Sequence, residues 1–161
     1  MTPPRDRVRP FLWAIGAFAV LHHADHVLRA DNSGWPFQPE VTPFTFSLLV
    51  YPALLTDYLV RNKPWLRVGL LSAGLASLFL VHVTVERPAD LFYTWATGES
   101  TTEHNPGMPN LLELASPVMG LAAVFVLTLL GAALGTTLAL AVRQALAGFR
   151  FEKSSRLLEV D

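Results

Sequence analysis

The chain has 161 residues and a net charge of −1; 16% of the residues are charged, 52% are hydrophobic, and the mean hydropathy is +0.38. Soluble proteins average about 25% charged residues, so this composition excludes a disordered chain, a basic surface for nucleic acid and an ordinary water-soluble domain. The chain has no cysteine, which excludes disulfides, thiolate nucleophiles, iron–sulfur clusters and cysteine-type zinc sites.

Four stretches contain no Asp, Glu, Lys or Arg: residues 10–24, 41–56, 68–85 and 114–142. With its edge residues, each approaches the roughly 20 helical residues that cross about 30 Å of hydrocarbon. We therefore predict an all-α fold, an integral membrane four-helix bundle that forms a single membrane domain over residues 1–161. The predicted spans are about 11–29, 43–60, 65–86 and 111–143, with a polar cytoplasmic tail over 149–161.

The second predicted span is the weakest, because Pro43 and Pro52 fall inside it. Proline is tolerated in a membrane helix when neighbouring groups satisfy the freed carbonyl. The first span has a basic segment before it, as a signal peptide has, but the residues His22 to His26 offer no small-residue cleavage site. We expect both segments to be retained as helices.

The basic residues predict one orientation. If the N-terminus is cytoplasmic, all of the 12 Lys and Arg residues except Arg29 and Arg87 lie on the cytoplasmic side. Such a bias is typical of plasma-membrane proteins, whose cytoplasmic loops are enriched in Lys and Arg. We therefore expect both termini in the cytoplasm and the connections 30–42 and 87–110 outside.

The two outer connections contain aromatic residues, among them Trp35, Phe37, Tyr93 and Trp95. Tyr and Trp rings are enriched at the level of the lipid headgroups. We expect these residues to anchor the connections at the membrane interface rather than to form a lid over a ligand.

Ionisable side chains gather in the outward half of the predicted bundle. His22, Asp25, His26 and Arg29 are spaced i, i+3, i+4 and i+7, so they share one helical stripe, whereas His23 points elsewhere. On the third span, His82 and Glu86 are spaced i and i+4. Glu113, at the start of the fourth span, and His104, in the second outer connection, lie in the same half.

Charged groups inside a membrane are costly, about 2.5–3.5 kcal/mol each at the bilayer centre, and such residues mark functional sites by default. Two histidines one helical turn apart can bind one metal ion, as His22 and His26 would. The pattern His22-x-x-Asp25-His26 resembles the H-x-x-E-H motif of inverzincin metalloproteases, with Asp25 in place of the glutamate. The resemblance implies zinc bound by the two histidines and Asp25 as a base.

We therefore predict a transition-metal site, for zinc or iron, with His22, His26, His82 and Glu86 as its ligands. Glu113 would add a carboxylate for a second metal, as in bundle-core carboxylate sites. Asp25 would orient a histidine or act as a catalytic base toward metal-bound water. The sequence does not decide whether a reaction is catalysed, nor on which small-molecule or lipid substrate.

Two other interpretations remain open at this stage. His82 and one histidine of the first span would also suit the axial ligands of haem b in an electron-transfer subunit. Alternatively, the cluster holds the helices together in an accessory or transport protein and binds nothing. Separately, Gly131 and Gly135 form a GxxxG pattern that would pack the fourth span inside its own bundle or against a second copy as a homodimer.

The predicted orientation is tested by fusing reporters to Asp161. We expect a C-terminal green fluorescent protein to fluoresce and a C-terminal alkaline phosphatase to be inactive, because each reporter functions on only one side of a bacterial inner membrane. An active phosphatase fusion would contradict the orientation.

Overall fold

The computed structural model describes residues 6–30, 33–60, 62–102 and 105–158, with side chains described as far as residue 148. Within these ranges the named elements are all helices. Their order is α1 (Arg9–Arg29), α2 (Pro43–Ser47), α3 (Val50–Leu59), α4 (Pro64–Thr84), α5 (Pro88–Thr97) and α6 (Pro117–Leu158).

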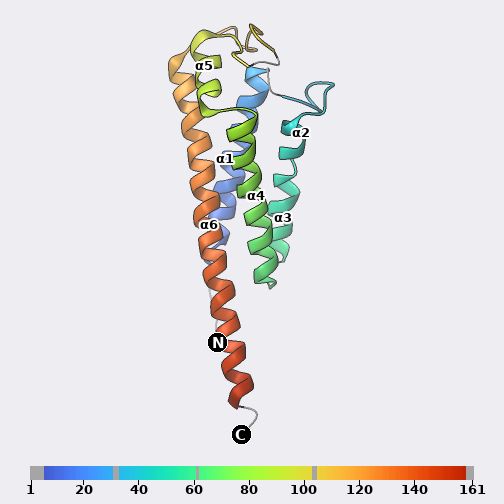
Figure 1. Ribbon diagram of the computed structural model, residues 1–161, viewed down its shortest axis with the longest axis vertical. Coiled ribbons are helices and arrows are strands. Elements are labelled where there is room, and N and C mark those ends of the chain that lie inside the picture. The colour runs from blue at the N-terminus through green and yellow to red at the C-terminus, as the bar shows by residue number, and fades with distance from the viewer. Residues whose placement is uncertain (1–5, 31–32, 61, 103–104, 159–161) are drawn as a thin grey trace.

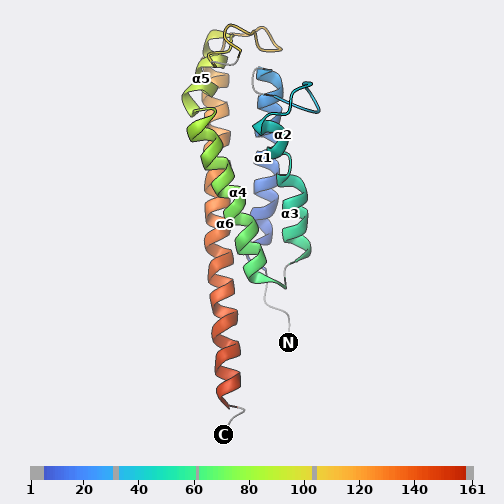
Figure 2. The same ribbon diagram turned by 45° about the vertical axis from the view of Figure 1, so that its right-hand side comes forward.

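Three helices form the body of the molecule. α1, α4 and the part of α6 up to Gly148 are each long and apolar enough to cross a membrane. They lie side by side, with α6 running in the opposite direction to α1 and α4 (Figures 1 and 2). The prediction of helices long and apolar enough to span a membrane is therefore confirmed for the first, third and fourth spans.

The second predicted span, 43–60, is not one helix. It forms α2 and α3, which follow one another beside α1 and are separated by a turn at Leu48 and Leu49 (Figure 2). Pro52 explains the break, because it has no N–H to donate to the carbonyl of Leu48, four residues earlier. The backbone compensates with a tighter bond from Tyr51 N to the carbonyl of Leu48, 3.3 Å. At about 1.5 Å per residue, neither piece alone crosses the hydrocarbon.

The helix α6 begins at Pro117, later than the predicted residue 111, because Asn110 holds the preceding segment in another conformation. The Asn110 side chain is buried; its amide nitrogen donates to the carbonyl of Leu114 over 2.9 Å, and its oxygen accepts from Leu112 N and Leu114 N. These bonds replace a helical ladder. Glu113 consequently lies outside the helix, with φ 50°, and is exposed.

The second outer connection contains a helix that the sequence analysis did not predict. Its first residues suit a helix start, with Pro88 in the first turn and the Asp90 carboxylate accepting from Arg87 N over 2.8 Å. Leu91 and Trp95 of this helix, α5, pack against Ala123 and Leu127 of α6. Trp95 is only 1% exposed, so its expected role as an interfacial anchor is wrong. It is a core residue.

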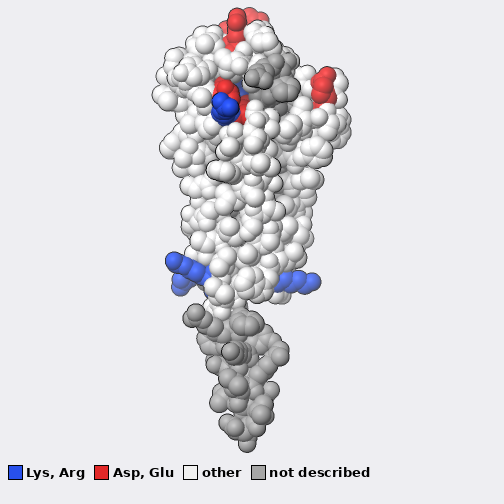
Figure 3. Space-filling model, viewed as in Figure 1, with Lys and Arg blue, Asp and Glu red and all other residues white. Residues whose placement is uncertain are grey.

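The charged side chains divide between the two ends of the molecule. On the face drawn in Figure 3, an uncharged band separates one end, which carries basic side chains, from the other, which carries mostly acidic side chains. We call the first the basic end; it holds Arg9, Lys63, Arg67 and Arg143. The opposite end, reached by the last turns of α1 and α4, is the histidine end. Between them lies an aliphatic core that includes Ile15, Leu71 and Leu134.

At the basic end, a buried ion-pair network joins three segments. Arg67 at the start of α4 donates to Asp57 of α3 over 3.0 Å and to Asp6, before α1, over 3.1 Å. Arg67 and Asp57 are both nearly inaccessible to solvent. Because an unpaired charge here would be costly, this network fixes α3 against α4 and the N-terminal segment.

The close approach of α5 to α6 is tested at Gly120. A Cβ added there would lie 2.6 Å from the backbone oxygen of Phe92, whereas a Cβ added at Gly135 would meet nothing within 4 Å. We expect Gly120→Ala to lower the free energy of unfolding by about 1–3 kcal/mol. Gly135→Ala, the matched control, should leave it within about 1 kcal/mol or raise it. Equal melting temperatures for the two variants in detergent would contradict this packing.

Candidate metal site at the histidine end

Three buried histidines converge at the histidine end. His22 and His26 lie one turn apart on α1, and His82 faces them from α4. One nitrogen of each ring can be chosen so that all three atoms lie within 4.8 Å of one another. The predicted stripe on α1 and the predicted face on α4 therefore do meet.

The distances between the rings suit a shared ion. His22 Nε2 lies 3.2 Å from His26 Nε2 and 3.2 Å from His82 Nε2. Two nitrogens bound to one zinc ion at about 2.0–2.1 Å in tetrahedral geometry are about 3.3–3.4 Å apart. The nitrogens are thus already close to the spacing that they would have as ligands of one ion.

Hydrogen bonds orient His82 for coordination. His82 Nδ1 lies 3.0 Å from the backbone oxygen of Glu86, so Nδ1 carries the proton and donates it. The lone pair of the neutral ring is then on Nε2, the atom that faces His22. A backbone carbonyl that fixes the tautomer of a histidine in this way is typical of metal ligands.

His26 has the opposite constraint. Arg29 NH2 lies 3.3 Å from His26 Nδ1, and because a guanidinium only donates, the proton of neutral His26 is on Nε2. The N–H of His26 needs a lone pair on His22 Nε2, whereas the lone pair of His82 needs a proton there. His22 Nε2 holds either a proton or one lone pair, so it cannot meet both needs. Among neutral rings, one of the two 3.2 Å contacts therefore joins like groups.

A charged network surrounds the histidines. Arg29 is completely buried; it donates to Asp25 over 2.8 Å and also pairs with Glu86, which is 1% exposed. Trp95 of α5 donates its indole N–H to the other oxygen of Asp25 over 2.7 Å. Glu86 Oε2 lies 3.5 Å from His26 Nε2. The formal charges of Arg29, Asp25 and Glu86 sum to −1. Together with Trp95, these groups join α1, α5 and the segment after α4.

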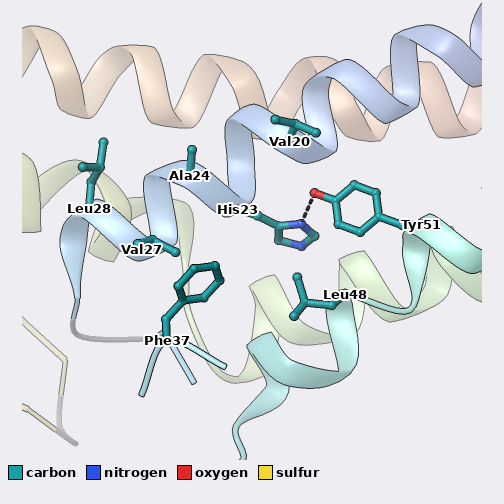
Figure 4. A pocket seen from close by; sticks show the side chains of 8 residues that line it. All are labelled: Val20, His23, Ala24, Val27, Leu28, Phe37, Leu48 and Tyr51. Atoms are coloured by element: carbon teal, nitrogen blue, oxygen red, sulfur yellow. Dashed lines mark hydrogen bonds between the residues drawn. The ribbon is translucent and has the colours of Figure 1, made fainter. Parts of the chain in front are cut away.

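His23 belongs to a different environment, as its position on the helix predicts. Its Nδ1 lies 2.7 Å from the Tyr51 hydroxyl (Figure 4). Its Nε2 lies 2.9 Å from the Ser47 hydroxyl, so both ring nitrogens are used. These bonds attach α1 to the broken segment of α2 and α3. They lie beside an open apolar cavity of about 480 Å³ that includes Val20, Leu48 and Phe37 (Figure 4).

A second cavity, of about 420 Å³, connects the site with the outside of the molecule at the histidine end. Buried His26 and Glu86 line it, as do the exposed residues Glu40 and Asn105. Phe44 of α2 also lines it, and the Phe44 ring lies 5.5 Å from the ring centres of both His26 and His23. Phe44 therefore contacts one lining histidine of each cavity.

The predicted residues are distributed as follows. His22, His26, His82 and Glu86 come together. Asp25 contacts Arg29 and Trp95, so its influence on a histidine acts through Arg29. Exposed Glu113, in the segment before α6, is not in the group of three histidines suited to an ion. His104 lies outside the described residues.

One contribution to this end of the molecule, the Trp95 indole that donates to Asp25, was not predicted. Trp95 was missed because its position depends on α5, whose packing has no periodic signal in a segment with many turn residues.

The GxxxG pattern is partly used inside the chain, since a Cβ at Gly131 would lie 3.8 Å from Leu78 of α4. The homodimer through Gly131 and Gly135 stays a prediction.

Comparison of the chain with protein-family models, with curated proteins and with solved structures gave no match. The fold and the site together define a class: an all-helical chain with three helices that can cross a membrane and three buried histidines that can hold a metal ion.

The contribution of Trp95 is tested by Trp95→Phe, which keeps a ring but removes the N–H that Asp25 accepts. We expect a loss of about 1.5–3 kcal/mol in the free energy of unfolding, the usual worth of a hydrogen bond to a charged group. Trp65→Phe, at a position 54% exposed, is the control and should have little effect. Equal effects of the two substitutions on thermal unfolding in detergent would contradict the assignment.

Proposed function

We propose that this chain is an integral membrane protein that binds one divalent transition-metal ion through His22, His26 and His82. The observation that carries the proposal is the pair of 3.2 Å contacts between Nε2 atoms. Hydrogen bonding among neutral rings satisfies only one of these contacts, whereas an ion at the centre accepts a lone pair from each ring. To give its Nε2 lone pair to the ion, the neutral His26 ring would carry its proton on Nδ1 instead, and Arg29 would give up its 3.3 Å contact with that atom.

The charge of the surroundings supports a cation. The carboxylates of Asp25 and Glu86 lie with Arg29 beside the histidines. A divalent ion would be attracted to carboxylates in this buried region, where electrostatic interactions are stronger than in water. Glu86 is close enough to act as a fourth ligand or to accept a hydrogen bond from metal-bound water, because its Oε2 lies 3.5 Å from His26 Nε2.

The donor atoms limit the metal and its chemistry. Imidazole nitrogens with a carboxylate suit zinc and iron, and the chain has no thiolate to favour softer ions. Three protein ligands with an open position are the pattern of catalytic zinc sites, in which the pKa of bound water falls to about 7. Metal-dependent hydrolysis in the membrane is therefore the activity that this site would support.

Haem is a poorer fit to the arrangement. A porphyrin between His22 and His82 would need open space on all sides of the line that joins them. His26 Nε2 lies 3.2 Å from His22 Nε2, and Glu86 and Arg29 lie within 3.5 Å of the His26 ring nitrogens. This crowding suits a single ion better than a macrocycle.

A bound proton is the second candidate, and one observation favours it. If His82 is protonated on both nitrogens, it donates to Glu86 O and to His22 Nε2, and the His26 N–H shares that one lone pair of His22. Neither 3.2 Å contact then joins like groups. In that case the cluster is a protonation site rather than a metal centre.

The proposed site faces the outside of the cell. The basic end carries the residues expected in the cytoplasm, and the cavity beside His26 opens at the opposite end. The core between the ends is aliphatic in the part of the chain that the structure describes. The site therefore exchanges ions with one side of the membrane only, as an enzyme or binding protein does.

Elemental analysis of the protein purified in detergent tests the proposal. We expect about one zinc or iron per chain after metal loading and removal of excess ion, and almost none in His22→Ala or His82→Ala, since each variant loses a ligand. His23→Ala is the matched control: it removes an adjacent, buried histidine of the same helix and should retain the metal.

An absorption spectrum separates the alternatives in the same samples. A Soret band would replace the proposal with haem. Wild-type protein that elutes as a folded species and holds no metal would favour the protonation site. Metal retained equally in His23→Ala, His22→Ala and His82→Ala would place the ion elsewhere.

A further inference from the structure

The cavity beside His26 is too large to serve the ion alone. Its volume is about 420 Å³. A metal ion with six waters occupies on the order of 200 Å³, given a share of roughly 30 Å³ per water. Pockets for small organic ligands begin at about 300 Å³. The cavity therefore has room for a small molecule next to a metal-bound water.

The cavity extends from exposed to buried residues. Exposed Glu40 and Asn105 lie at its outer part, whereas His26 and Glu86 at its inner part are 6% and 1% exposed. An ion held by His26 would therefore be within reach of a molecule that enters from the outer part. Gln38, Ser33 and Thr42 add polar groups, and Phe44, Val81 and Val85 add apolar surface.

The charge of the lining distinguishes between ligands. Glu40 and Glu86 both line the cavity, and its described lining contains no Lys or Arg. Arg29, the basic group nearest to Glu86, is itself 0% exposed and is paired with Glu86 and Asp25. An anion entering the cavity would meet the Glu40 carboxylate without a basic lining residue to compensate for the repulsion.

We propose that this cavity is a substrate pocket for small uncharged or cationic molecules, and that Glu40 at its outer part excludes anions from the metal. The proposal rests on the proposed metal site, because the molecule would bind to the ion through a nitrogen or oxygen atom. Glu40 determines specificity and does not hold the ion. Its side chain is exposed, and its backbone oxygen accepts from Trp35 N over 2.7 Å, a bond that survives substitution.

The test uses Co²⁺ as a visible probe in the full-length protein in detergent. Imidazole, uncharged at pH 8, and azide, an anion, are titrated separately while the ligand-field spectrum of the bound Co²⁺ is recorded. The wild type is compared with Glu40→Lys. Glu99→Lys is the matched control, because Glu99 is an exposed acid at the same end that does not line the cavity.

We expect Glu40→Lys to bind azide about tenfold more tightly than the wild type, because charge reversal near the ion replaces repulsion with attraction. Imidazole binding should change less than about twofold, and Glu99→Lys should match the wild type for both probes. Azide affinity unchanged in Glu40→Lys, or raised equally in Glu99→Lys, would overturn the proposal and leave the metal site standing. Failure of every variant to bind Co²⁺ would overturn both.

Discussion

The arrangement of the histidine end depends on the ion pair between Arg29 and Glu86. Both side chains are buried at the level where two long helices end. A buried charge without its partner costs several kcal/mol, so the register of α1 against α4 that joins the two groups is strongly favoured over others. That same register places His82 opposite His22. Trp95 and Asp25 extend the constraint to α5, because the indole N–H binds the carboxylate that holds Arg29.

The consequence for the site is preorganisation. The His26 and His82 rings are held by hydrogen bonds to Arg29 and to the backbone of Glu86, and the Phe44 ring of α2 packs against His26. Elsewhere the long helices meet through aliphatic contacts that specify position only loosely. Ion pairs thus fix the positions of the helices at the two ends. Arg67, Asp57 and Asp6 do so at the basic end, and Arg29 and its partners do so at the histidine end. This separation explains how a chain with few charges fixes its helices and keeps a site open on one side.

Much of the site follows from the sequence, because helical spacing alone puts His22 and His26 on one stripe and His82 beside Glu86. Depth in a membrane then brings such residues to a similar level in neighbouring helices. The sequence does not show which helices are neighbours, so the Arg29–Glu86 pair and the indole of Trp95 appear only in three dimensions. Two boundaries were missed for local reasons: Pro52 divides the second span, and the side chain of Asn110 keeps Glu113 out of α6. Both residues can be recognised in the sequence, but each competes with a long apolar run that favours a continuous helix.

X-ray absorption at the zinc edge reports whether three imidazoles from two helices bind one ion. For protein loaded with one zinc, we expect nitrogen neighbours at about 2.0–2.1 Å, with the outer-shell scattering of three imidazole rings. His82→Ala should reduce the ring signal or abolish binding, and His23→Ala should leave the spectrum as it is. A first shell made of oxygen alone, with no imidazole scattering, would contradict the account.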